Sequence, residues 1–281
     1  MSWRGQLDLH YRFDGQRTTA LDRHDGPLRV LQRLYPEGDA ICHHVLVHPP
    51  GGVVGGDTLT LQAQLDPGSH ALITTPGATR FYKSAGGTGE QIVAASVAEG
   101  ARLEWLPLES IAYPGCKAIN RMRFELAPGA SMIGWDVVAL GLPAAQQAFE
   151  DPAWPESHFT QEIDLPDVWL ERGTVGSQDH LLLDSPLGWA GNRVMATLWF
   201  ANGVELDRPL SERLLDAARE KQLESPLAAL SGSTQPHAQV VVTRVLAPRV
   251  EPAMALLTAI WGQWRSLAWG VSPCPPRVWR T

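Results

Sequence analysis

The segment His48–Asp57, HPPGGVVGGD, holds the densest group of unusual residues in the chain. Two Gly-Gly pairs flank Val53 and Val54, and such pairs allow backbone torsions or close approaches that other residues resist. The segment lacks the Gly-Lys-Ser/Thr ending and the strand–loop–helix context of a phosphate-binding loop. It predicts either a tight connection between strands or a functional loop, because turn glycines alone do not require the carboxylate of Asp57.

A second group is Cys42, His43 and His44, followed four residues later by His48. Imidazole and thiolate side chains ligate zinc and nickel. No second Cys or His cluster in the sequence completes a tetrahedral ligand set. Packing within the fold is one interpretation, and the other is a transient, low-coordinate metal site at Cys42, His43 and His48, with no permanently bound metal.

Two carboxylates interrupt apolar runs: Asp136 in IGWDVV and Glu171 in VWLER. Burying a carboxylate is unfavourable unless it is ion-paired, coordinated or facing a water-filled passage. One interpretation is an internal ion pair, for instance between Glu171 and an arginine. The other is a polar lining that hosts a cation, since carboxylates and water suit a passing hard cation.

Motifs of hydrolytic enzymes are absent from the sequence, which has no G-x-S-x-G, H-E-x-x-H or C-x-x-C pattern. A catalytic triad assembles in space, so its residues need not be neighbours in the chain. A stand-alone metal-dependent hydrolase, based on Cys42, His43, His44 and His48, is therefore the alternative function.

Short β-strands are expected to position these residues. Residues 7–13 and 59–65 alternate apolar and polar side chains with period two. Further strands are expected at 71–75, 91–97, 101–106, 121–126, 132–140, 158–165, 168–171, 193–200 and 239–246. Pro-Gly and Gly-rich turns separate them, which is typical of a mainly β protein.

A weak internal repeat supports stacked sheets. Leu65–Ala71, Val97–Leu103 and Leu126–Met132 share an apolar-x-x-Gly pattern, with glycines 32 and then 29 residues apart. An alternating strand precedes each segment and an apolar one follows it. Hairpin-like tiers stacked along an axis are predicted, unless shared turn chemistry alone explains the pattern.

Two helices are expected late in the chain. One covers about 210–223, and the other opens near Glu251 and ends before Gly270. The apolar stripe of the second helix is Leu257, Ile260, Trp261, Trp264 and Ala268. Because no low-complexity linker divides the sequence, we expect one domain over 1–281, with β tiers over about 1–200 and helices and tail over about 205–281.

The composition argues against several classes of protein. The 281 residues include 23 Lys and Arg against 30 Asp and Glu, so a net charge of −7 disfavours a broad nucleic-acid-binding face. No window approaches about 18 uninterrupted apolar residues, so no membrane span is expected. Three scattered cysteines do not form a disulfide framework and Met1–His10 does not read as a signal peptide, so a cytoplasmic location is expected.

Five segments carry a family resemblance. In chain order they are HPPGGVVGGD at 48–57, TTPGATRFYKS at 74–84, LEWLPLESIAYPG at 103–115, GWD at 134–136 and PRVWRT at 276–281. Together they resemble the UreD family of urease accessory proteins, called UreH in some bacteria. The resemblance covers essentially the whole chain, and its first two motifs are specific at this spacing.

The resemblance implies a mainly β fold with superposed β-sheets in a helical, β-helix-like arrangement and two α-helices in the C-terminal third. It implies a nickel-insertion chaperone, not an enzyme, that binds apo-urease and UreF and, through UreF, the GTPase UreG. Nickel would then be transferred cargo rather than a resident cofactor, and would move through a water-filled internal passage toward urease.

Carried over motif by motif, the resemblance assigns five residues to the lining of that passage: Asp57, Thr79, Arg80, Asp136 and Glu171. It also implies that the C-terminal helix and the tail to Thr281 contact UreF, here through Trp261, Trp264, Arg277 and Trp279. The match is loose at His43 and His48, and His44 is less typical of the family. The chain has Leu142-Pro143-Ala144 where many relatives carry Arg and a later Gly-Glu pair, so contacts of that loop are not carried over.

Overall fold

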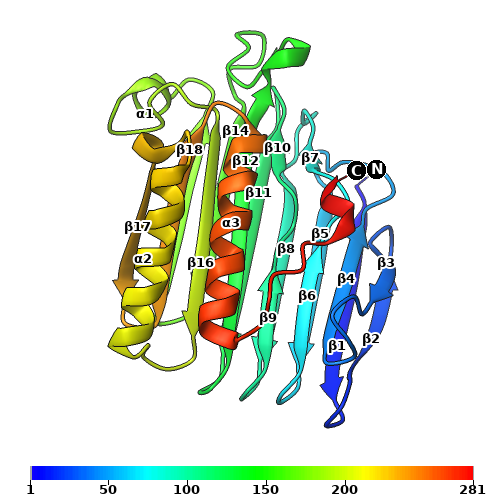
Figure 1. Ribbon diagram of the computed structural model, residues 1–281. Helices are drawn as coiled ribbons and strands as arrows, with labels where there is room; N and C mark the ends of the chain where they lie inside the picture. The colour runs from blue at the N-terminus through cyan, green and yellow to red at the C-terminus, as the bar shows by residue number, and fades with distance from the viewer. Residues whose placement is uncertain (1, 281) are drawn as a thin grey trace.

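Two β-sheets pack face to face, and the helices α2 and α3 cover the outer face of one of them (Figure 1). The computed structural model describes residues 2–280. Met1 and Thr281, the outermost positions of the expected N-terminal segment and C-terminal tail, lie outside the described residues. The sheet without helices is called sheet A, and the sheet that α2 and α3 cover is called sheet B.

Sheet A has the strand order β15-β14-β11-β8-β5-β1-β2. Its strands are β1 Arg4–Phe13, β2 Thr18–Asp25, β5 Thr58–Leu65, β8 Gly89–Val97, β11 Lys117–Leu126, β14 His158–Leu165 and β15 Trp169–Gly176. Each strand from β1 to β14 pairs in parallel with the next, in the order β1, β5, β8, β11, β14.

Sheet B has the order β17-β18-β16-β12-β9-β6-β4-β3, and β7 and β10 extend it beside β12. Its strands are β3 Arg29–Leu34, β4 Ile41–Val47, β6 His70–Thr74, β7 Thr79–Phe81, β9 Arg102–Trp105, β10 Ser110–Ala112, β12 Ser131–Leu142, β16 Val194–Asn202, β17 Ser231–His237 and β18 Val240–Ala247. A short strand, β13 Gln147–Ala148, pairs with the end of β12. The helices are α1 His180–Asp184, α2 Arg208–Glu224 and α3 Val250–Trp269, with 3-10 turns η1 Pro143–Ala145, η2 Ala228–Leu230 and η3 Arg277–Arg280.

The predicted repeat forms three coils of a β-solenoid: β5–β6, β8–β9 and β11–β12. Gly68, Gly100 and Gly129 occupy the equivalent turn position with φ of 73°, 70° and 80°, a left-handed conformation that favours glycine. The turns are hydrogen-bonded to one another, since Gly68 N donates to Glu99 O and Gly100 N donates to Gly129 O, each at 3.2 Å. The tiers are confirmed, but they are not hairpins, because each turn carries the chain from sheet A to sheet B.

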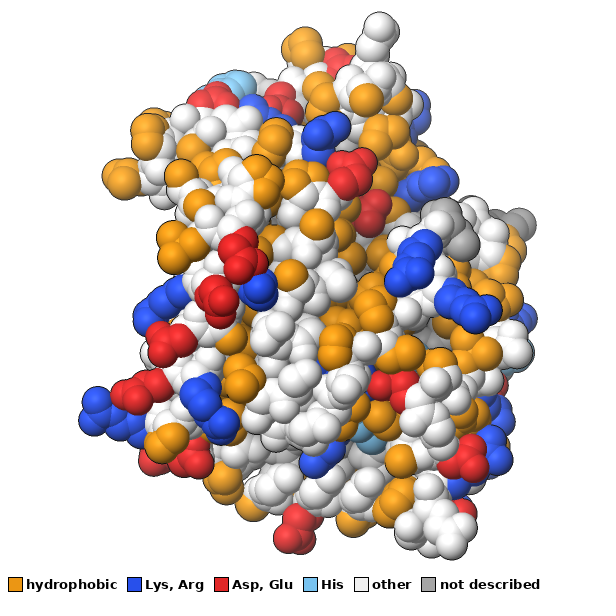
Figure 2. Space-filling view, viewed as in Figure 1, with side chains coloured by type: hydrophobic (Ala, Val, Ile, Leu, Met, Phe, Trp, Pro, Cys, Tyr) orange, Lys and Arg blue, Asp and Glu red, His pale blue; other side chains and the backbone are white. Residues whose placement is uncertain are grey.

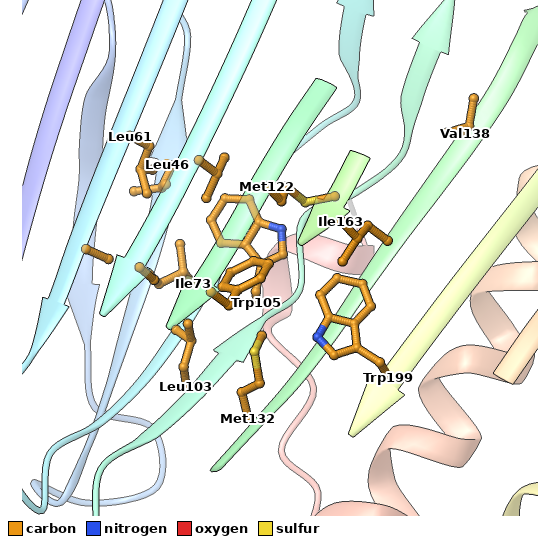
Figure 3. Close-up of a cluster of buried hydrophobic side chains, with 14 of the residues drawn as sticks. Leu46, Leu61, Ile73, Leu103, Trp105, Met122, Met132, Val138, Ile163 and Trp199 are labelled. Atoms are coloured by element: carbon orange, nitrogen blue, oxygen red, sulfur yellow. The ribbon is translucent and has the colours of Figure 1, made fainter. Parts of the chain in front are cut away.

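Two hydrophobic cores lie on the two faces of sheet B. Figure 3 shows Trp105, Met122, Met132, Ile163 and Trp199 directed into the space between the sheets. The second core joins sheet B to α2 and α3. The strand β12 serves both cores, because successive side chains of a strand point to opposite faces.

The predicted helices are confirmed, with bounds close to those expected. Asp207 caps α2 by accepting from Leu210 N at 2.7 Å, and Gly270 ends α3 in the left-handed conformation at φ 66°. The short helix α1 was not predicted. The segment 205–281 also contributes the hairpin β17–β18 to sheet B, so it is not composed of helices and tail alone.

No helix within residues 2–280 has the length and apolar character needed to cross a membrane.

Candidate functional site

A row of amide side chains crosses sheet A on its inner face. Asn120 of β11 is in register with Gln91 of β8 on one side and with Gln161 of β14 on the other. Gln91 Nε2 donates to Asn120 Oδ1 at 3.1 Å. Asn120 is 1% exposed and Gln161 is 8% exposed, so these polar groups lie inside the solenoid.

Asp136 of β12 faces this row from sheet B and is buried, with 3% of its surface exposed. Asn120 Nδ2 donates to its Oδ1 at 3.0 Å, and Gln161 Nε2 donates to its Oδ2. Alternation along the strand explains the GWD motif. Trp135 points toward the helices, and a Cβ on inward-facing Gly134 would lie 2.2 Å from the Trp199 ring.

Burial raises the pKa of Asp136 to about 7, against the opposing effect of the two amide hydrogen bonds. The charge of Glu171 raises it further. Within residues 2–280, Asp136 makes no salt bridge. Its carboxylate is thus solvated by amides only, and no side-chain cation in contact with it balances its charge.

We use the name polar row for Gln91, Asn120, Gln161, Asp136 and Thr197. Thr197 of β16 is buried and lies in register with Asp136 on one side and with Arg244 of β18 on the other. Glu171 of β15 lies opposite Ile163 of the inter-sheet core, so it faces inward, and it forms a salt bridge with Arg244. The row therefore ends at an ion pair between the two sheets.

The other end of the row opens into a pocket of about 390 Å³ between the sheets. Thr79 and Arg80 of β7 line it together with His48 and Gln91. The remaining lining is largely apolar and includes Leu46, Leu59, Leu61 and Trp105. Because Gln91 belongs to both, the pocket borders one end of the polar row.

Asp57 is a closing residue of the glycine-rich loop rather than a lining residue of this pocket. Its buried carboxylate accepts from Trp3 N at 2.8 Å and from Val54 N at 3.1 Å. The glycines permit close packing of the loop: a Cβ on Gly52 would lie 2.2 Å from the Tyr82 ring, and one on Gly55 would lie 1.9 Å from Ser84 Oγ. Burial lowers the pKa of His48, and the nearby charge of Asp57 opposes that shift.

Cys42, His43 and His48 are not brought together. Cys42 and His43 are neighbours on β4 and point to opposite faces, Cys42 into the inter-sheet core and His43 toward Glu37 on the other side. His48 lines the pocket. Within the described part of the chain, no group of three or more His, Cys, Asp or Glu side chains is arranged to hold a metal ion.

A second polar group, which sequence reasoning did not identify, lies on the helix face of sheet B. We call Glu37, His43, His70, Glu104 and Arg265 the buried charge cluster. Glu104 of β9 accepts from Arg265 Nε at 3.1 Å and from Trp261 Nε1 at 2.7 Å, and lies 2.8 Å from His70 Nε2. Arg265 of α3 also donates to both carboxylate oxygens of Glu37 at 2.6 and 2.8 Å.

The two carboxylates of this cluster share the guanidinium of Arg265. Burial raises the pKa of Glu104, but the hydrogen bond and charge of His70 and the charge of Arg265 outweigh it, so the pKa is lowered. Glu37 behaves in the same way: burial is outweighed by His43 and Arg265, and its pKa is lowered. Both carboxylates are therefore held in the ionised form around one guanidinium.

The assignment of Trp261 and Trp264 to a partner-binding surface is corrected by the structure. Both are fully buried between α3 and the rest of the protein, where Trp264 Nε1 donates to Leu214 O at 2.8 Å. Trp279 packs on Trp135 and Trp261 with ring centroids 5.1 and 5.7 Å apart, which anchors the tail beside α3. Arg277 is exposed.

The exposed face of α3 consists largely of small or uncharged residues. They include Ala255, Ala259, Gln263 and Ser266. In Figure 2, charged side chains gather over α2, while few lie over α3. Any surface that α3 offers to a partner is therefore neutral rather than aromatic.

The fold and this interior define a β-solenoid with a buried polar row between its sheets. The UreD urease accessory protein family model matches residues 4–280. The urease accessory protein UreD of Leptothrix cholodnii is 61% identical over 283 residues, covering all of both chains. Those of Paracidovorax citrulli and Variovorax paradoxus are each 54% identical, covering 99% and 100% of both chains. The chain belongs to the UreD family of urease accessory proteins.

Proposed function

We propose that this protein is a nickel-insertion chaperone that binds apo-urease and, together with UreF and the GTPase UreG, delivers nickel to urease. In this proposal nickel is cargo that crosses the space between the sheets along the polar row, and the protein itself catalyses no reaction. The observation that carries the proposal is Asp136, a buried carboxylate whose hydrogen-bond partners are amides and which makes no salt bridge within residues 2–280.

The chemistry of the row supports a cation in transit. A buried unpaired carboxylate is unfavourable, and a cation beside it relieves that penalty. Carboxylate, amide and hydroxyl oxygens suit a hydrated divalent cation without binding it as tightly as a cage of thiolates and imidazoles would. Thr79 and Arg80 stand at the pocket end, and Glu171 stands at the other end. Asp57 contributes by holding the loop beside the pocket.

The surface for UreF is proposed to be the exposed face of α3 together with the tail. The support is the uncharged stripe of Ala255, Ala259 and Gln263 on α3, together with the exposed Arg277 in the tail. The buried indoles act indirectly, since Trp261 and Trp279 hold α3 and the tail in place. No observation favours the alternative of a metal-dependent hydrolase, because Cys42 and His43 point to opposite faces of β4.

The proposed passage is tested with Asp136→Asn in a purified activation assay that contains apo-urease, UreF, UreG, GTP, bicarbonate and nickel. Nickel bound to urease and urease activity are both measured over time. We expect the rate of nickel incorporation to fall by roughly tenfold, corresponding to about 1.4 kcal/mol added to the barrier for transit.

Asp164→Asn is the matched control, because Asp164 pairs with Arg123 at 2.7 Å and is partly exposed on the outer face of sheet A. The control should activate urease normally. Normal activation by a folded Asp136→Asn protein would contradict the proposed passage.

A further inference from the structure

The Glu171–Arg244 pair occupies the place where the polar row reaches the edge of the solenoid. Asp136, Thr197 and Arg244 stand side by side on β12, β16 and β18. Two strand spacings of about 4.8 Å put the backbone of Arg244 roughly 10 Å from that of Asp136. Glu171 reaches Arg244 from β15, the edge strand of sheet A.

The two side chains differ in exposure: Glu171 is 18% exposed, whereas Arg244 is 55% exposed. The carboxylate thus lies inside and the guanidinium covers it from the solvent side. Among residues 2–280, Arg244 is the one basic side chain that forms a salt bridge with either of the inward-facing acids Asp136 and Glu171. It takes the position that a cation would occupy if it were bound to Glu171.

We propose that Arg244 gates the edge of the passage by competing with the divalent cation for Glu171. With no cation present, the guanidinium neutralises Glu171. A hydrated divalent cation that advances from Asp136 takes over the carboxylate, and Arg244 swings into solvent, where more than half of its side chain already lies. This inference rests on the proposed function, because it assumes that the cation travels along the polar row.

Arg172 provides a matched control on the same strand as Glu171. It pairs with Glu162 at 2.6 Å and is 59% exposed, close to the exposure of Arg244. Adjacent side chains of a strand point to opposite faces. Because Glu171 faces inward, Arg172 lies on the outer face of sheet A. Arg172→Gln removes a salt bridge of the same kind without touching the interior.

The experiment measures Ni²⁺ binding to the full-length protein by equilibrium dialysis for Arg244→Gln, Arg244→Lys and Arg172→Gln. Arg244→Gln should bind Ni²⁺ roughly fivefold more tightly, the scale expected when a partly exposed competing charge is removed. Arg244→Lys should resemble the unmodified protein, because it retains the charge, and Arg172→Gln should be unchanged. The gain should shrink at high salt, which screens the competing charge.

An affinity for Arg244→Gln equal to that of Arg172→Gln would overturn the gate. The same result would leave the passage itself standing, provided that Asp136→Asn still blocks nickel incorporation. Conversely, normal activation by Asp136→Asn would remove the passage whatever Arg244→Gln does. The proposed gate and the proposed passage are therefore tested by different measurements.

Discussion

Two buried carboxylate groups lie on opposite faces of sheet B, and they are stabilised in different ways. On the helix face, Glu104 and Glu37 surround the guanidinium of Arg265. On the inter-sheet face, Asp136 has Asn120 and Gln161 as neighbours and no basic partner among residues 2–280. The pKa is lowered at Glu104 and raised to about 7 at Asp136.

The difference separates an ion-paired cluster from the carboxylate that we propose interacts with a cation in transit. A buried carboxylate that is surrounded by its own cation is satisfied and fastens the elements that carry the charges. One that is surrounded by amides alone keeps an unbalanced charge, and a passing cation stabilises it. Burial alone would not distinguish Glu104 from Asp136, because both are almost completely buried.

The largest expected effect is on the buried charge cluster. Arg265→Met leaves Glu37 and Glu104 without their shared cation, and uncompensated buried charges destabilise a protein by about 3–5 kcal/mol. The free energy of unfolding, measured by denaturant titration, should fall by that amount. The exposed Arg219 of α2 supplies the control, since Arg219→Met should change little. A loss similar to that of the control would show that the cluster does not fasten α3.

A smaller effect of opposite sign is expected at Asp136. Above pH 7 the carboxylate is charged and buried, so Asp136→Asn should stabilise the protein by about 1–2 kcal/mol, after the loss of hydrogen-bond acceptance from the amides is subtracted. Destabilisation of this variant above pH 7 would mean that the unmodified carboxylate already has its charge balanced.

The pH dependence of stability separates the two groups by sign. The carboxyl of Asp136 ionises near pH 3.8 in the unfolded chain and near pH 7 in the folded protein. Between these values the folded state binds more protons, so the contribution of Asp136 to the free energy of unfolding declines as pH rises. The lowered pKa values of Glu37 and Glu104 act oppositely. Their contribution is present above the ordinary pKa of 4.5 and is lost as pH falls below it. Unfolding free energies from pH 4 to 8 should show a weaker decline toward high pH in Asp136→Asn, and a slope identical to that of the unmodified protein would refute this.

The smallest effect is expected at the Glu171–Arg244 pair, which is intermediate between the two groups because it has a cation but is partly exposed. A double-mutant cycle with Glu171→Gln and Arg244→Gln should give a coupling of about 0.2–1 kcal/mol in unfolding free energy. A coupling of several kcal/mol would mean that the pair belongs with the buried charge cluster and is too strong to open for a cation.

The strands β1, β5 and β11 were predicted from their alternation, and the buried β6 and β12 were predicted from their apolar runs. The largely exposed β2 and β3 were not predicted, and neither was β4, in which Ile41–Leu46 are all buried. With His43 and His44 in its middle, β4 shows neither an alternation nor an uninterrupted apolar run. The motif in β4 was therefore interpreted through its ligand-type side chains. The period of α3 was predicted correctly, but the stripe that carries Trp261 and Trp264 is a core face.

The polar row was only half visible in the sequence. Asp136 was identified because it interrupts an apolar run. Asn120 and Gln161 occupy the apolar phase of alternating strands, which is a usable signal. The sequence did not show that the packing of sheet A on sheet B brings them to Asp136. The buried charge cluster was harder to recognise from the sequence, because Glu104 and Arg265 are 161 residues apart in the chain.

The stacked turns at Gly68, Gly100 and Gly129 fix how far the chain advances with each coil. The polar row runs across the strands rather than along them, so its reach is counted in strand spacings of about 4.8 Å each. The spacing of the strands therefore sets the distances between the interior polar groups. Insertions in the long loops at the opposite ends of the strands can reshape the surface, but they leave the spacing of the interior groups unchanged.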